Sequence, residues 1–120
     1  MTRKTAATPE QLVSLFGEFA NAGDIEGLVS LYEADAVVAI GDPVATGEAA
    51  IREFYTGLLA KRSSFPLVEA RPALISGDVA MTVTPLPNGK CSLEVARRQA
   101  DGSWRWMIDQ LKVDLGAPKA

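Results

Sequence analysis

The sequence contains no histidine among its 120 residues and only one cysteine, Cys91. Without histidine there is no Ser-His-Asp or Cys-His nucleophile pair, no histidine-ligated zinc or iron, and no acid–base catalysis by imidazole. With one cysteine no intrachain disulfide can form, which favours a reducing compartment and predicts a cytoplasmic location. Any chemistry must use carboxylates, Tyr, Lys, Arg, Ser, Thr or bound water.

Long apolar runs and glycine-rich phosphate loops are also absent. No segment approaches the roughly 20 apolar residues that span a bilayer, and neither Gly-x-Gly-x-x-Gly nor Gly-x-x-x-x-Gly-Lys occurs. The net charge is −3, from 12 basic and 15 acidic residues, which gives no electrostatic reason to bind nucleic acid. We therefore expect no membrane or nucleic-acid partner, no cofactor and no metal.

The length and the hydrophobic content favour one independently folding unit. Hydrophobic residues make up 48% of the chain, enough to form a core without disulfides or metal. We expect a single domain over residues 1–120, with its core at about 8–113 and flexible ends at 1–7 and 114–120.

Three amphipathic stripes predict three helices in the first half of the chain. The first begins at Thr8 and ends at Gly23, the second is capped by Asp24 and continues to Tyr32, and the third follows residues 46–48. The tight link between the first two helices predicts a hairpin or a sharp elbow.

The remaining segments favour β-structure. A short β-branched run at 37–40 precedes the third helix, and strands are expected at 67–75, 79–84, 93–98 and 104–113. Asn88-Gly89 and Asp101-Gly102 are hairpin signals. The predicted class is α+β, with three N-terminal helices packed on a curved antiparallel sheet.

Three segments carry a resemblance to a known superfamily. They are GDIEGLVSLY at 23–32, then DAVV at 35–38 leading to GEAAIREFY at 47–55, then EVARRQADGSWRW at 94–106. They resemble the nuclear-transport-factor-2-like superfamily, which includes SnoaL-like proteins and ketosteroid isomerases, and the last is most similar to uncharacterised bacterial SnoaL-like proteins. The resemblance covers about residues 8–113. It implies a cone-shaped fold with a pocket between helices and concave sheet, and a homodimer built on the sheets.

The isomerase site does not carry over to this sequence. The resemblance places Phe16 where those enzymes have an oxyanion-donating tyrosine, and Arg97 where they have a protonated aspartic acid. Their base falls at Ile40, with Asp42 two residues later. The sequence therefore argues against steroid isomerisation by that mechanism, while Asp42 stays a candidate base. Its Gly-Asp-Pro setting also suits an ordinary turn.

Arg97 and Asp109 are the second candidate pair. A three-residue loop in the Asp101-Gly102 hairpin would put both on the face of Leu93 and Val95, which we expect to point inward. The pair would then anchor an anionic or carbonyl ligand, with Asp109 as a possible base, or form a closed ion pair. Exposure of both charges on an outer face is the third alternative.

The other pocket candidates are mostly apolar. Trp104 and Trp106 would alternate onto the outer face, where they predict a dimer interface or a stacking site. Tyr32 and Tyr55 lie on helix stripes, as core residues or as hydroxyl donors to a ligand. The residues expected to bind a ligand are Phe16, Tyr32, Tyr55, Met81, Val83, Val95, Arg97, Met107 and Leu111.

Three functions remain open at this point. The first is a homodimeric SnoaL-like domain that binds a small hydrophobic ligand. The second is a cofactor-free lyase, isomerase or hydrolase acting on a small hydrophobic carbonyl compound, with Asp42 or Asp109 as the base. The third is a non-catalytic interaction module whose cavity is filled by side chains. Cavity volume separates the third from the others, since a ligand site needs about 300 Å³ or more.

Overall fold

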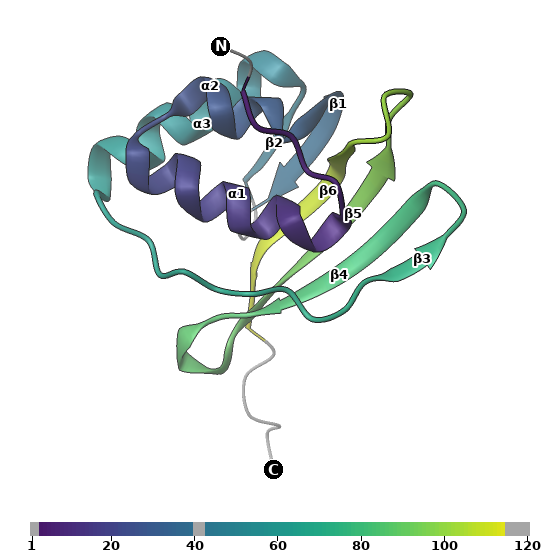
Figure 1. The fold of residues 1–120 in the computed structure, drawn as a ribbon. Helices are drawn as coiled ribbons and strands as arrows, with labels where there is room; N and C mark the ends of the chain where they lie inside the picture. Colours follow the sequence, from purple (N-terminus) through teal and green to yellow (C-terminus); the bar gives the residue numbers. More distant parts are fainter. Residues whose placement is uncertain (1–2, 40–42, 115–120) are drawn as a thin grey trace.

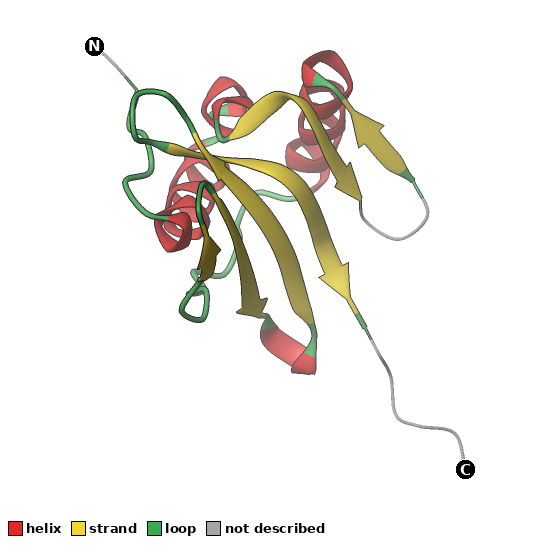
Figure 2. Ribbon diagram, turned by 90° about the vertical axis from the view of Figure 1, so that its right-hand side faces the viewer, coloured by secondary structure: helices red, strands yellow, loops and turns green. Residues whose placement is uncertain are grey.

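The computed structural model describes residues 3–39 and 43–114. Three helices lie on one face of a six-stranded sheet with the order β2-β1-β6-β5-β4-β3 (Figure 1). The helices are α1 (Pro9–Ala22), α2 (Ile25–Ser30) and α3 (Glu48–Lys61), and the strands are β1 (Tyr32–Ala39), β2 (Val44–Thr46), β3 (Leu74–Ser76), β4 (Val79–Pro85), β5 (Cys91–Arg98) and β6 (Trp104–Val113). The predicted α+β class with three helices on a curved sheet is confirmed (Figure 2).

The helix ends follow the predicted capping signals. The Thr8 hydroxyl accepts a hydrogen bond from the backbone N–H of Gln11 at the start of α1. Gly23 ends α1 with φ of 71°, a left-handed conformation that glycine adopts at little cost. Asp24 then caps α2 by accepting from the N–H of Gly27. Two residues thus separate the helices, which is the tight link that the sequence predicted.

Several boundaries differ from the expected ones. Helix α2 ends at Ser30, and Tyr32 is already the first residue of β1. The strand expected over 67–75 is only β3 at Leu74–Ser76, so residues 62–73 form an irregular connection, here called the strap. Pro66 and Pro72 lie in the strap, and proline has no N–H to donate to a ladder. Strand β1 pairs with β6 in parallel, although all other pairs are antiparallel, as expected.

The inner and outer faces of the sheet are the reverse of those expected. Small and hydroxyl-bearing residues of β4 face the helices, namely Ala80, Thr82 and Thr84, while Met81 is exposed. On β5 the buried positions are Ser92, Glu94 and Ala96, and Leu93 lies on the opposite, outer face. The expectation that Leu93 and Val95 point inward was wrong because it assumed that the apolar residues of an alternating strand must face the helices. Here the outer face is apolar too.

A β-bulge in β6 changes which residues share a face. Ala96 pairs with Trp106, but Val95 pairs with Ile108, so Met107 has no partner on β5. Trp106 and Asp109 therefore both point toward the helices although three positions separate them. Trp104 and Trp106 are buried at 6% and 2% exposure in the core, so the prediction that they form an outer dimer interface is wrong.

Candidate functional site

The main cavity lies between α1, the strap and the concave face of β4, β5 and β6. Its volume is about 1000 Å³. Figure 1 shows the strap leaving the end of α3, passing beneath α1 and crossing the sheet to β3. The walls include Val13 and Phe16 from α1, Leu58 from α3, Phe65, Leu67 and Val68 from the strap, and Trp106 and Leu111 from β6. Such a volume is large enough for a drug-sized ligand.

Few hydrogen bonds hold the strap over the cavity. The side chain of Asn21 accepts from the backbone N–H of Phe65 at 2.8 Å and donates to its carbonyl at 3.2 Å. Further along, the N–H of Ala73 donates to Glu10 at 2.9 Å. Gly17 allows this approach, because a β-carbon there would lie 3.1 Å from the Leu67 side chain.

Asp109 forms the polar centre of the cavity. Its side chain is 2% exposed, and its Oδ2 accepts a hydrogen bond of 2.5 Å from the Tyr32 hydroxyl. The hydroxyls of Tyr32 and Tyr55 lie 2.5 Å apart. Because Tyr32 uses its proton toward Asp109, Tyr55 donates to Tyr32, which gives a relay Tyr55–Tyr32–Asp109 from α3 through β1 to β6.

Burial changes the protonation of this relay. Desolvation, with a smaller contribution from the nearby Glu94 charge, raises the pKa of Asp109 to about 8, although the Tyr32 hydrogen bond opposes the shift. The pKa values of Tyr32 and Tyr55 are raised well above their usual value, first by desolvation and then by the Asp109 charge. At neutral pH the whole relay is therefore predominantly protonated and neutral.

A second buried carboxyl, Glu94, stands beside Asp109. The two residues are direct cross-strand partners on β5 and β6, and Glu94 is also 2% exposed. Its Oε1 accepts from Thr82 at 2.6 Å and from Thr84 at 2.9 Å, and its Oε2 accepts from Ser92. Glu94, Thr84 and Ser92 all line the cavity. Three hydroxyls therefore replace the water that a buried carboxylate loses.

Two polar atoms in this region lack a partner. Within residues 3–39 and 43–114, neither Nε1 of Trp106 nor Oδ1 of Asp109 makes a hydrogen bond, although both are buried. Both side chains line the cavity. Unpaired buried polar atoms are rare in native proteins and commonly mark the place of a bound water or ligand.

Three of the predicted site residues line this cavity, namely Phe16, Asp109 and Leu111. Tyr32 and Tyr55 do not form the wall: Tyr32 donates a hydrogen bond to Asp109, and Tyr55 is linked to Asp109 only through Tyr32. Asp42 lies outside the described residues.

Arg97 does not meet Asp109. It lies on the outer face, with its side chain 48% exposed, and forms an ion pair with Glu33 at 3.0 Å. The hypothesis of an inward Arg97–Asp109 pair is therefore wrong, because the bulge at Met107 moves Asp109 to the opposite face. Met81, Val83 and Val95, predicted as pocket residues, also belong to the outer face, and Met107 is the unpaired bulge residue.

Glu94 and its three hydroxyl donors were not predicted as site residues. The signal was present, because Thr82, Thr84, Ser92 and Glu94 alternate on one face of two adjacent strands. A buried acid needs such donors, so a run of hydroxyls opposite an acid can mark an inner face as well as an outer one.

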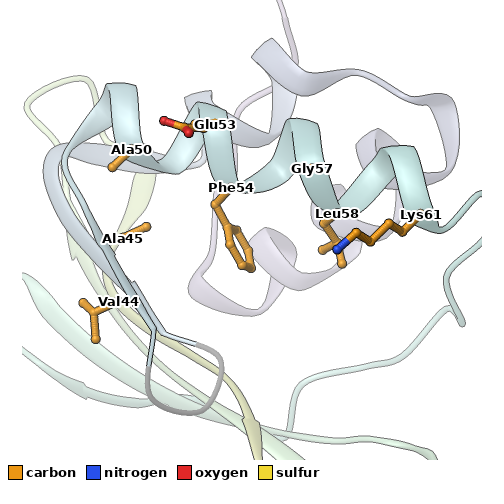
Figure 3. A pocket seen from close by; sticks show the side chains of 8 residues that line it. All are labelled: Val44, Ala45, Ala50, Glu53, Phe54, Gly57, Leu58 and Lys61. Carbon is orange, nitrogen blue, oxygen red and sulfur yellow. The ribbon is translucent and has the colours of Figure 1, made fainter.

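A smaller groove of about 470 Å³ lies between α3 and the edge strand β2. Figure 3 shows Phe54 and Ala45 extending into the space between these two elements. The groove is mostly apolar, and Glu53 and Lys61 are its charged residues. It lacks the unpartnered polar atoms of the main cavity, so the main cavity is the stronger candidate site.

Within the described ranges, no group of three or more Cys, Asp or Glu side chains is placed to hold a metal ion. No helix among these residues has both the length and the apolar character needed to cross a membrane.

No protein-family model matches the chain. Solved structures do match. A protein of unknown function with a cystatin-like fold from Nostoc punctiforme aligns with a TM-score of 0.70 and 18% identity over 90% of each chain. An NTF2-like protein from Novosphingobium aromaticivorans aligns with a TM-score of 0.64 and 23% identity, over 91% of this chain and 80% of that chain. A ketosteroid isomerase-like protein from Erwinia carotovora atroseptica aligns with a TM-score of 0.64 and 20% identity, over 92% of this chain and 100% of that chain.

These similarities define the class of fold. The chain has the NTF2-like, cystatin-like fold, and the resemblance predicted from the sequence is confirmed at that level. Since one fold of this kind hosts many functions, the function must be argued from the site.

Proposed function

We propose that the protein binds a small, largely hydrophobic molecule in the main cavity, with a polar end directed at Asp109 and Trp106. The observation that carries this proposal is the pair of unpartnered buried atoms, Asp109 Oδ1 and Trp106 Nε1, on side chains that line an otherwise mainly apolar cavity. An unmet buried donor or acceptor costs about 1–3 kcal/mol. A ligand that supplies the missing partners gains that energy in addition to the burial of its apolar body.

Filling the cavity is expected to abolish this binding. Leu111 is half-buried on the cavity wall, so Leu111→Trp should occupy part of the volume. With N-phenyl-1-naphthylamine as a neutral fluorescent probe, we expect strong fluorescence enhancement for the wild type and at least about tenfold weaker binding for the variant. Ile75→Trp, on an exposed edge strand, is the matched control. Equal enhancement in Leu111→Trp would place the probe elsewhere and contradict the proposal.

A second candidate function is catalysis on a small hydrophobic carbonyl compound. It is favoured by the raised pKa of Asp109, about 8, because a neutral carboxyl can donate a hydrogen bond or a proton to a carbonyl oxygen. A cofactor-free lyase, isomerase or hydrolase of this type would use Asp109 as its acid–base group. The substrate oxygen would meet Asp109 and the N–H of Trp106.

We further propose that the protein forms a homodimer through the outer face of the sheet. Residues that are direct cross-strand partners form one apolar row across five strands of the outer face. They are Leu74, Met81, Val95, Ile108 and Val37. Leu74, Met81 and Ile108 are exposed at 69%, 44% and 47%. Contiguous apolar patches of this kind usually mark an interface, and a second copy of the chain offers a self-complementary surface.

A charge in the centre of that face is expected to separate the subunits. We expect sedimentation of the wild type at micromolar concentration to show a dimer, and Ile108→Asp to show a monomer, because a buried unpaired carboxylate is costly. Ile75→Asp, at an exposed position of β3 whose cross-strand partner Ala80 faces the helices, should leave the dimer unchanged. A monomeric wild type would contradict the proposed dimer.

The proposed location is the cytoplasm. The only cysteine, Cys91, is free, which suits a reducing compartment. The net charge of −3 gives no electrostatic support for a nucleic-acid partner.

A further inference from the structure

The floor of the main cavity carries two acidic groups and no compensating cation. Glu94 and Asp109 are each 2% exposed and face one another across β5 and β6. Among the residues that the structure describes, no lysine or arginine forms an ion pair with either group. The cavity therefore has a floor that favours positive charge.

Three basic residues line the cavity, namely Arg62, Lys90 and Lys112, and Lys112 is exposed. Arg62 stacks over the ring of Phe65 at 4.5 Å and donates to the Ser64 carbonyl. Lys90 is 3.8 Å from the carboxylate of Asp114. None of the three forms an ion pair with Glu94 or Asp109, so a charged ligand that reaches the floor meets mainly the acids.

The walls beside the acids are aromatic. Phe16 lies between two other cavity rings, with its centroid 6.4 Å from that of Phe65 and 6.1 Å from that of Trp106. Aromatic faces attract cations, whereas an anion gains nothing from them. The unpartnered Oδ1 of Asp109 is an independent sign that a polar group of a ligand belongs at this end of the cavity.

We propose that the ligand of this cavity is an organic cation, a protonated amine on a hydrophobic body, whose ammonium group lies beside Glu94 and donates to Asp109 Oδ1. The proposal rests on the proposed function, because it specifies the charge of the ligand that the cavity binds. The hydrophobic body would pack on Phe16, Phe65 and Trp106. A hydroxyl near the nitrogen would also give Trp106 Nε1 an acceptor.

Binding of a cation at this position has a consequence for Asp109. The groups that face its carboxyl are Tyr32 from β1, Tyr55 from α3 and Glu94 from β5, and none of them carries a positive charge. Asp109 is predominantly protonated at neutral pH, since its pKa is raised to about 8. An ammonium group favours the ionised form, so the protein should release a proton as the amine binds.

The test uses three probes of similar shape, phenethylamine, 2-phenylethanol and 3-phenylpropionate, in isothermal titration calorimetry with the full chain. We expect phenethylamine to bind at least about tenfold more tightly than the alcohol, and the carboxylate to bind most weakly. The heat of amine binding should depend on the ionisation enthalpy of the buffer, which reports the released proton. Its affinity should rise with pH up to about 8, by at most about tenfold per unit.

Glu94→Gln should remove most of the advantage of the amine over the alcohol, and Glu53→Gln, at an exposed position outside the main cavity, is the matched control. The wild-type measurements test the proposal even if Glu94→Gln fails to fold. Equal or tighter binding of the alcohol or the carboxylate would overturn the cationic ligand but leave the proposed function standing. An amine advantage that persists in Glu94→Gln would overturn the role of Glu94. Absence of binding by all three probes would count against both proposals.

Discussion

The free energy of unfolding is expected to fall as the pH rises from about 5 to about 8, by up to about 1.4 kcal/mol per pH unit. The cause is Asp109, whose pKa is raised to about 8 by burial, whereas an aspartate in an unfolded chain titrates near its usual value of 3.8. Between these two values the folded protein holds one proton more than the unfolded chain. Rising pH therefore favours the unfolded chain, and this contribution to stability is lost as the pH passes through 8.

Other acids act outside this window. The pKa values of Glu10 and Asp101 are lowered, chiefly by a backbone hydrogen bond at Glu10 and by the Ser103 hydroxyl at Asp101. Their contributions are present above the unfolded pKa and are lost only as the pH falls below about 4. The slope between pH 5 and 8 therefore reports mainly Asp109.

Asp109→Asn is expected to flatten this profile. The amide is neutral at every pH and keeps an oxygen that can accept from Tyr32, so the variant should be more stable than the wild type at pH values above about 8. Urea denaturation across the pH range measures both effects. Asp35→Asn makes the same chemical change at an exposed position and should keep the wild-type slope. An unchanged slope in Asp109→Asn would show that Asp109 is ionised in the folded protein throughout the range.

The sequence predicted the local elements of this fold well where short-range chemistry decides them. Thr8, Gly23 and Asp24 marked both ends of α1 and the start of α2 correctly because capping depends on residues within one turn. The short strand β2 and the parallel pairing of β1 with β6 were not predicted. The pairing of β1 with β6 joins segments that are distant in the chain, so no local turn sequence indicates it.

The candidate site could be predicted only in part, because one extra residue in β6 changes its geometry. Period-two alternation puts Asp109 on the face of Met107, but the bulge leaves Met107 unpaired and turns Asp109 inward with Trp106. Nothing in the local sequence fixes the position of that bulge. The bulge separates Arg97 from Asp109, and the reversed face of β5 turns Arg97 outward.

The choice of inner face failed for a different physical reason. Alternating apolar residues in a strand indicate that one face of the sheet is covered. In this protein the helices cover the inner face, and the dimer that we propose would cover the outer face. Met81 and Val95 lie on the outer patch that we assign to a second subunit, whereas Thr82 and Glu94 face the helices. A single chain cannot distinguish burial within the fold from burial between subunits by composition alone.

Removing the two threonine hydroxyls that donate to Glu94 Oε1 is expected to destabilise the fold by about 3–6 kcal/mol. Thr82 and Thr84 supply both hydrogen bonds to that oxygen, at 2.6 and 2.9 Å, and a hydrogen bond to a charged group contributes about 1.5–3 kcal/mol. Thr82→Val with Thr84→Val keeps the side-chain shape and leaves Oε1 without these donors inside the protein. Urea denaturation at neutral pH measures the loss.

Two further variants show whether the charge of Glu94 is the cause. Thr56→Val removes an exposed hydroxyl that donates to the Arg52 carbonyl on α3, and it should change the free energy of unfolding by less than about 0.5 kcal/mol. Adding Glu94→Gln to the double threonine variant should restore part of the lost stability, because a neutral amide costs less to leave underpaired than a carboxylate. If the double threonine variant is as stable as the wild type, Glu94 does not depend on these hydroxyls.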